Sequence, residues 1–389
     1  MFKSALDVFN EMLNDKGRNV LYYEKALTHD SFTTLDFSDI EQYFIDGNKK
    51  GCIPDVCKQF FDKKGNRVRH VFSVYLLGIY CYDNITVIKS DFNDFIEKIW
   101  KATEYSADAA NKEDDLRRDF LYLWYLTALF HDMGYPYERE KEIVDNERYE
   151  SISSIITEKT MMKKDCFDCR GNILGIPKAV KNAAKGYFYH RLKDCCFNEK
   201  TCVDHGFAGG YILYKALKDL HCGSQYKSPV DINKNRLVFS KYIFDNYNIP
   251  SAWAIVCHNI WLAEFGRGRD EKYKHFKLDE LIFESEHSLI NHKDHPLLFL
   301  LDFLDTLDPV KRFGESALDC IFFSSSNGNV DVLTMKICCC QNCKTSCAMS
   351  GVCMDKIRKD LSFLKSDTFD FKTNDDDSIT FSFCSAIKI

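Results

Sequence analysis

A strongly apolar segment that ends in two polar residues is the feature that most constrains this chain. Residues 114–132, DDLRRDFLYLWYLTALFHD, begin with an acidic first turn, as helix N-termini favour, and then become apolar. The pattern predicts a buried helix that ends in adjacent His131 and Asp132, where Gly134 and Pro136 favour a helix stop. A buried helix does not need a His-Asp pair at its tip, whereas a metal site does.

The bulk composition favours a globular protein with a large core. The chain has 389 residues, of which 45% are apolar and 28% charged, and its formal net charge is -6. This length suggests two domains, or one large domain with an appendage. The N-terminus does not resemble a signal peptide, and no apolar run reaches the roughly 18 residues needed to span a bilayer. We therefore expect a cytoplasmic location and no membrane partner.

Helical segments dominate most of the chain, so we expect a mainly α fold. Residues 1–66 would form an N-terminal helical cap, and residues 67–314 the main helical domain, with an insertion at about 141–203. Residues 315–389 contain the strand-like stretches VDVLTMKI and TFDFKTNDDDSITFSF, with the helical stretch MDKIRKDLSFL between them. They predict a small Cys-rich α+β appendage.

Histidines and aspartates recur within the predicted apolar helices. They are His70, His131, Asp132, His205 and His258, followed by Asp302, Asp305 and Asp308, which are three residues apart and so share one helix face. Taken singly, such a histidine is more often a hydrogen-bonded core residue, and Asp302 and Asp308 are more often surface residues or partners of arginines. Taken together, buried imidazoles and carboxylates need a shared partner, which a divalent metal supplies. These donors suit Mn, Fe, Zn, Ni or Co, and carboxylates suit Mg.

The order of these residues resembles the HD superfamily of metal-dependent phosphohydrolases. The stretches HVFSVYLLG, ALFHDMGY, DHGFAGGYIL and LLDFLDTLD are similar to its motifs and span residues of about 67–314. The resemblance implies a helical HD-domain bundle that holds one or two divalent metals. It implies His70, His131, Asp132 and Asp305 as ligands of the first metal. It also implies His205 and His258 as ligands of a second metal, with Asp132 as the bridge.

The chain departs from the usual HD pattern at three positions. Tyr135 stands where relatives often carry Lys or His, Asn259 replaces the second His of a double-His motif, and Leu304 replaces a common Ala. The cyclic di-GMP phosphodiesterase branch carries a Gly-Tyr-Pro motif downstream of the His-Asp signature. Here the Gly-Tyr-Pro at 134–136 lies inside the signature itself, so that branch is not supported.

The resemblance implies hydrolysis of a phosphoester or phosphoanhydride by a metal-activated water, and it favours a nucleotide or nucleotide-like substrate. His131 and Asp132 would form the catalytic centre. Candidate substrate contacts are Tyr135, Arg69 and Arg312, with Lys311 and Arg139 also near motif residues. Three alternatives stay open: a metal-dependent nuclease on single-stranded nucleic acid, a di-iron HD-type oxygenase, and a regulatory binding module. The best basic patch for a nucleic acid is the stretch 178–193.

The 18 cysteines favour thiols or metal ligands over disulfides in a reducing compartment. Cys340, Cys343, Cys347 and Cys353 are spaced compactly enough for four thiolates around a structural zinc or an iron–sulfur cluster. A second close pair, Cys166 and Cys169, lies in the predicted insertion. The simpler alternative is that cysteine serves as a small apolar filler.

Overall fold

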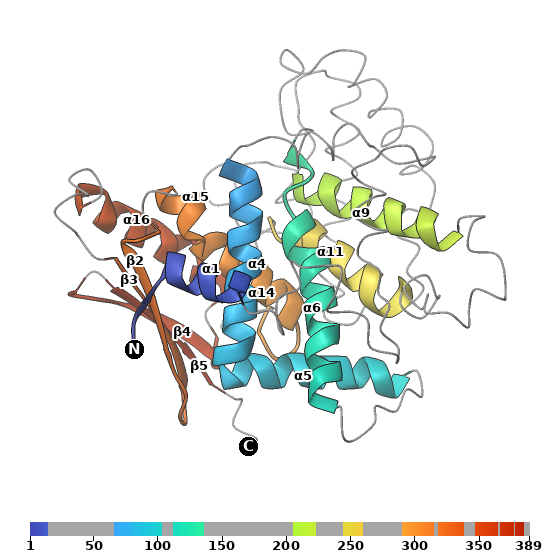
Figure 1. Ribbon diagram of the computed structural model, residues 1–389, viewed down its shortest axis with the longest axis horizontal. Coiled ribbons are helices and arrows are strands. Elements are labelled where there is room, and N and C mark those ends of the chain that lie inside the picture. Colours follow the sequence, from blue (N-terminus) through green and yellow to red (C-terminus); the bar gives the residue numbers. More distant parts are fainter. Residues whose placement is uncertain are drawn as a thin grey trace, which may run out of the picture. The chain divides into compact units, whose positions relative to one another are not determined.

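The computed structural model of the chain (Figure 1) divides into two compact units. Unit 1 comprises Met1–Tyr22, Gly65–Leu129 and Leu281–Ile389, and unit 2 comprises Tyr23–Lys64 and Phe130–Glu280. The structure describes residues 1–14, 66–102, 112–135, 205–222, 244–259, 290–314, 318–337, 347–364, 366–376 and 378–384.

Several predicted features lie outside the described residues. They are the insertion at 141–203 with its basic stretch 178–193, Arg139, and the cysteines Cys166, Cys169, Cys340 and Cys343. Cys347 and Cys353 lie in a described helix, but their side chains are outside the description. The domain boundaries at 66/67 and 314/315 stay predictions.

Unit 1 is mainly helical in its described part, which confirms the predicted helical character of the chain. Its helices are α1 (Ala5–Asn14), α4 (Asn66–Asn84), α5 (Thr86–Ala102), α6 (Lys112–Phe130, whose last residue belongs to unit 2), α14 (Pro296–Leu307), α15 (Pro309–Phe313) and α16 (Cys347–Asp360). The apolar helix predicted from residues 114–132 corresponds to α6, and the stretch HVFSVYLLG lies in α4. The first turn of α6 carries three acidic residues, which complement the helix dipole.

Helices α4 and α6 approach each other closely because a glycine faces a tryptophan. A Cβ added at Gly78 would lie 2.1 Å from the Trp124 ring, so only glycine leaves room for the indole. The Trp124 Nε1–H donates to the Tyr75 carbonyl at 2.9 Å, and the Tyr82 and Phe120 rings stack at 3.9 Å. These contacts bury a large aromatic core, and burial raises the pKa of the Tyr75 phenol above its ordinary value.

The helical segment predicted to carry three aspartates on one face is broken in two. Asp308 leaves the helical conformation at φ -50°, ψ 120°, and caps α15 by accepting the Lys311 backbone N–H. Pro309 follows and lacks the N–H that a continuous helix needs. Asp308 therefore does not lie on the same helix as Asp302 and Asp305. Of the two alternatives for Asp302 and Asp308, the one that makes them surface residues is wrong, since they are 2% and 0% exposed.

A five-stranded antiparallel sheet accompanies these helices in unit 1. Its order is β1-β2-β3-β5-β4, formed by β1 (Lys3–Ser4), β2 (Ile321–Ser326), β3 (Asp331–Ile337), β4 (Phe369–Asn374) and β5 (Ser378–Phe383). The predicted strands correspond to β3, β4 and β5, and the predicted helix between them to α16. Strand β2, which runs to Ser326, was not among the predicted strands.

The sheet shares an apolar core with α14. Phe303 contacts the rings of Phe369, Phe381 and Phe383 at centroid distances of 5.6, 5.0 and 5.7 Å. Phe299, one turn earlier on α14, contacts Phe369 at 5.1 Å. Strand β1 pairs with β2 through Lys3 and Phe323, which joins the first residues of the chain to its C-terminal sheet.

His292 ties three parts of unit 1 together and predicts a large stability effect. Its Nδ1 lies 2.5 Å from an Asp91 carboxylate oxygen on α5, and its Nε2 lies 2.9 Å from the Thr368 carbonyl. Both partners are acceptors, and the imidazole is 1% exposed. Removing the imidazole leaves the buried Asp91 carboxylate and the Thr368 carbonyl without this hydrogen-bond partner, so His292→Ala is expected to lower the free energy of unfolding by about 1–3 kcal/mol.

Denaturant titration of wild type and His292→Ala measures this loss. Lys293→Ala, which removes the exposed neighbouring side chain, is the control and should unfold like wild type. A loss below about 1 kcal/mol for His292→Ala would contradict this role.

Unit 2 contributes three described helices. They are α9 (His205–Cys222), a short π-helix (Phe244–Asn248) and α11 (Ile249–Cys257), with the turn 131–135 before them. Figure 1 shows α9 and α11 side by side, and they are in contact. Every described residue of α11 is buried.

Among the described helices, none is by itself long and apolar enough to cross a membrane. One pair, Arg69–Asn84 with Thr86–Lys101, passes that test by length and composition, but its members are bent by 96°.

Candidate metal centre

His131 and Asp132 lie in a tight turn at the start of the second segment of unit 2, Phe130–Glu280. Helix α6 ends at Phe130, and the Met133 N–H donates to the Phe130 carbonyl while the Tyr135 N–H donates to the Asp132 carbonyl. His131 and Asp132 are 0% and 2% exposed, so this predicted pair is buried. The turn presents both side chains beside α9.

Glycines allow the turn to pack directly on the backbone of α9. A Cβ at Gly134 would lie 1.9 Å from the His205 carbonyl oxygen and 2.5 Å from the Gly209 nitrogen. In turn, a Cβ at Gly209 would lie 3.2 Å from the His131 carbonyl oxygen. Only residues without a side chain permit this approach, which brings His205 to the His-Asp turn.

The other glycines of the HGFAGG stretch bring α9 against α11. A Cβ at Gly210 would lie 2.4 Å from the Ala252 carbonyl, and one at Gly206 would lie 2.9 Å from the Ile255 carbonyl and 3.0 Å from the His258 ring. The helices therefore meet backbone to backbone at the level of His205 and His258. The sequence alone linked these glycines to an HD motif, and the structure gives their packing role.

The backbone orients the His258 imidazole. His258 caps the C-terminus of α11, and its Nδ1 lies 2.6 Å from the Ile255 carbonyl oxygen. A carbonyl only accepts hydrogen bonds, so Nδ1 carries the proton and donates it. In the neutral ring this leaves the Nε2 lone pair for a metal, which is the usual arrangement of a histidine ligand.

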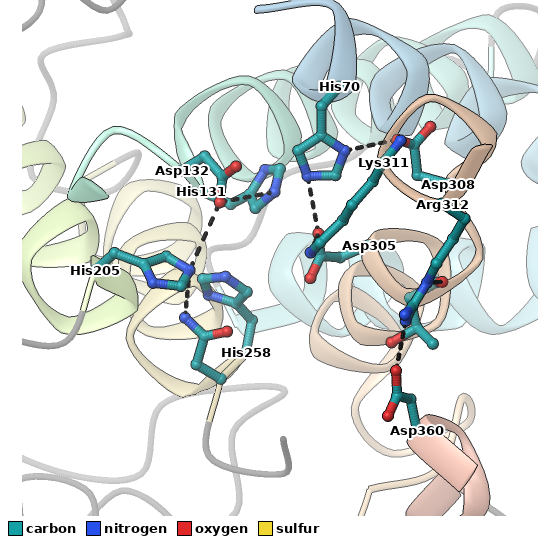
Figure 2. Close-up of polar contacts among 12 residues, drawn as sticks. His70, His131, Asp132, His205, His258, Asp305, Asp308, Lys311, Arg312 and Asp360 are labelled. Atoms are coloured by element: carbon teal, nitrogen blue, oxygen red, sulfur yellow. Dashed lines mark hydrogen bonds and ion pairs between the residues drawn. The ribbon is translucent and has the colours of Figure 1, made fainter. Parts of the chain in front are cut away.

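Two neighbours fix the His205 ring. The Tyr135 ring stacks on it at a centroid distance of 3.8 Å and an interplanar angle of 14°. The Asn259 amide Nδ2 lies 2.6 Å from its Nε2. Figure 2 shows His205 and His258 converging on Asp132, with His131 beside it. From the sequence, Asn259 was identified only as a replacement of the second His in a double-His motif. Its contact with His205 was not predicted.

These residues form a group that can hold a metal ion. Asp132, His205 and His258 each offer one ligand atom, and the three atoms lie within 4.8 Å of one another. The His131 Nε2 and the His205 Nε2 lie 3.4 and 3.6 Å from Asp132 Oδ1. We call His131, Asp132, His205 and His258 the unit 2 cluster. The two imidazoles and one carboxylate of the buried trio Asp132, His205 and His258 suit Mn, Fe, Co, Ni or Zn.

The remaining predicted ligands, His70 and Asp305, are brought together in unit 1. His70 on α4 is 4% exposed, and its Nε2 lies 2.9 Å from an Asp305 carboxylate oxygen on α14. Its Nδ1 lies 2.7 Å from Asp308, which also accepts hydrogen bonds from Ser73 Oγ and, at 2.6 Å, from the Lys311 N–H. The carboxylate on Nδ1 orients the imidazole and directs its Nε2 to Asp305 (Figure 2).

Sequence reasoning missed the roles of Ser73 and Asp308 in this arrangement. Ser73 follows His70 by three residues, a helical spacing that puts both on one side of α4. Asp308 precedes a proline, which is a signal for a helix boundary and for a capping side chain. Both signals are visible in the sequence, but the pairing of α4 with the α14–α15 break is a tertiary contact.

The candidate substrate contacts have different surroundings. Arg69 is exposed, and Tyr135 is half-buried against His205. The Arg312 guanidinium donates to the Thr306 carbonyl and to Asp360, each at 2.7 Å, so it joins α15 to α14 and α16. Lys311 donates from its ammonium to Asp305 at 2.6 Å.

The described cysteines Cys81, Cys257 and Cys320 are buried thiols, as expected for small apolar fillers. Burial raises the pKa of the Cys81 thiol above its ordinary value, which disfavours the reactive thiolate. A structural metal at Cys340, Cys343, Cys347 and Cys353 stays a prediction.

Comparison of the chain with protein families, with curated proteins and with solved structures finds no match.

Proposed function

We propose that this protein is a metal-dependent phosphohydrolase of the HD type, acting on a nucleotide or nucleotide-like phosphoester or phosphoanhydride. The observation that carries the proposal is the buried trio Asp132, His205 and His258, with ligand atoms within 4.8 Å of one another. These residues would hold a divalent metal, which would supply a water of lowered pKa as nucleophile and neutralise charge on the phosphate.

The residues of the unit 2 cluster have separate roles in this proposal. Asp132 offers a carboxylate beside the rings of both His131 and His205, which suits a bridging ligand. His258 presents Nε2 because Ile255 holds its Nδ1–H. Tyr135, stacked on His205, keeps that ring in place and carries a phenol that can donate to a phosphate oxygen.

The resemblance to the HD superfamily adds His70 and Asp305 to the ligand set. Within unit 1 both are buried, and His70 is oriented by Asp308 as a metal-bound histidine is by its carboxylate partner. The full set of six ligands and the helical HD bundle remain predictions from the sequence motifs. A substrate preference for nucleotides rests on the same resemblance.

A second candidate function uses the same cluster. Two histidines and one carboxylate are also the donor set of non-haem iron sites that activate oxygen. The trio in unit 2 has this composition, which favours an iron-dependent oxygenase as the alternative. Loading the protein with Fe²⁺ in air and recording its visible spectrum distinguishes the two, since a persistent iron-dependent band with substrate oxidation supports the oxygenase.

Hydrolysis assays test the proposed activity. The purified protein is loaded in turn with Mn, Co, Ni, Fe, Zn or Mg and incubated with nucleotides, cyclic and linear dinucleotides, and single-stranded DNA and RNA. We expect metal-dependent release of phosphate or of a nucleoside monophosphate from the small substrates. Cleavage of the nucleic acids alone would replace this proposal by the nuclease. A protein that binds metal but hydrolyses none of these substrates would contradict the phosphohydrolase and favour the binding module.

A further inference from the structure

Lys311 contacts both of the carboxylates that lie beside His70, namely those of Asp305 and Asp308. Its backbone N–H donates to Asp308, which caps α15, and its ammonium reaches back to Asp305 Oδ1 at 2.6 Å. The Asp305 side chain is 3% exposed, whereas the Lys311 side chain is 31% exposed. The partly exposed lysine side chain therefore pairs with a carboxylate that is itself buried.

The ammonium occupies a position that the proposed function needs for a metal. Asp305 Oδ1 is the oxygen that also meets His70 Nε2, at 2.9 Å. If Asp305 and His70 both act as ligands, the oxygen that faces His70 Nε2 is the one placed to share an ion with it. Two cations at one carboxylate oxygen repel each other strongly where water is scarce. Metal binding at Asp305 Oδ1 therefore favours release of the ammonium from this oxygen.

The released ammonium stays beside the site. The backbone of Lys311 is held by the Asp308 cap, so only the flexible four-carbon side chain moves. Arg312, the other basic residue of α15, is committed to Thr306 and Asp360. A lysine ammonium next to a metal site is suited to a phosphate oxygen, as a point charge with three donors.

We propose that Lys311 is a resident cation that neutralises Asp305 before metal binding and then contacts the phosphate of the substrate. This proposal rests on the proposed function, because it takes Asp305 as a metal ligand. It makes two predictions of opposite sign for one substitution. Without the ammonium, Mn²⁺ meets no competing cation at Asp305, and a phosphate loses one charged partner.

Lys311→Met keeps the length of the side chain and removes its charge. In isothermal titration calorimetry we expect it to bind Mn²⁺ about 5-fold more tightly than wild type, the upper end for a partly exposed ion pair. The Mn²⁺-loaded variant should bind inorganic phosphate about 10-fold more weakly, as expected for a lost charged hydrogen bond. Its melting temperature should also rise more on Mn²⁺ addition than that of wild type.

Two variants serve as controls. Lys336→Met removes the cation of an exposed ion pair with Asp376 and should leave both affinities unchanged. Lys311→Arg keeps the charge and should stay close to wild type in both titrations. Equal or weaker Mn²⁺ binding by Lys311→Met, or unchanged phosphate binding, overturns this inference while the proposed function stands. Wild-type protein that binds no Mn²⁺ overturns both.

Discussion

Asp132→Ala is expected to lose metal binding and hydrolysis together. The Asp132 carboxylate is the only anionic ligand in the trio that unit 2 brings together within 4.8 Å, and it lies beside His131 and His205. Loss of a partner that merely orients a ligand costs about 10–100-fold in metal affinity, so loss of the ligand itself should cost at least about 100-fold. Calorimetric titration of Mn²⁺ and the phosphate-release assay measure the two effects.

Asp119→Ala is the matched control for removing a buried aspartate. Asp119 is 0% exposed, but its carboxylate accepts from the Trp100 indole and from Arg118. Its loss should lower stability without changing the Mn²⁺ affinity of the folded protein. Metal affinity that is equal in Asp132→Ala and wild type would remove Asp132 from the ligand set.

Gly134→Ala is expected to weaken the metal site from outside the ligand set. The added methyl would lie 1.9 Å from the His205 carbonyl oxygen, so the His-Asp turn must move away from α9. The displacement separates Asp132 from His205. We expect a loss of about 1–3 kcal/mol in stability, typical of overpacking, and a fall of about 10-fold or more in Mn²⁺ affinity.

Gly78→Ala is the control that separates a general loss of stability by overpacking from displacement of the His-Asp turn. Its methyl would lie 2.1 Å from the Trp124 ring in unit 1, so it should destabilise the protein to a similar extent. Calorimetry at a temperature where both variants are folded should show weakened Mn²⁺ binding for Gly134→Ala only. Equal Mn²⁺ affinities in the two variants would mean that the turn does not position the site.

The apolar helices could be predicted from the sequence because the pattern of apolar residues in a segment indicates which of its side chains are buried. The run from Phe120 to Phe130 predicted α6, and the alternating residues of 331–337 predicted β3. The residues of the trio in unit 2 were also predicted as ligands, since several imidazoles and carboxylates that recur within apolar helices are unusual when they are taken together. What the structure adds is that Asp132, His205 and His258 lie within reach of one ion.

Tertiary contacts explain what the sequence left out. Strand β1 has two residues and exists because Lys3 and Ser4 pair with Phe323 and Phe322, more than 300 residues away. The spacing of the three aspartates predicted one helix face, but Pro309 breaks the helix and Asp308 turns to His70. Lys311 was named from the sequence as a base near the last motif, and its contact with Asp305 depends on the same break. None of these contacts can be predicted from a local sequence pattern.

The metal content of the purified protein tests the central claim most directly. Wild-type protein is loaded with Mn²⁺, dialysed, and analysed by plasma mass spectrometry beside the variant Asp132→Ala/His205→Ala/His258→Ala, with circular dichroism to confirm that both are folded. We predict that wild type retains about one equivalent of metal or more per chain, and that the variant retains only background metal. Wild-type protein without metal, or a folded variant that retains as much metal as wild type, would contradict the account.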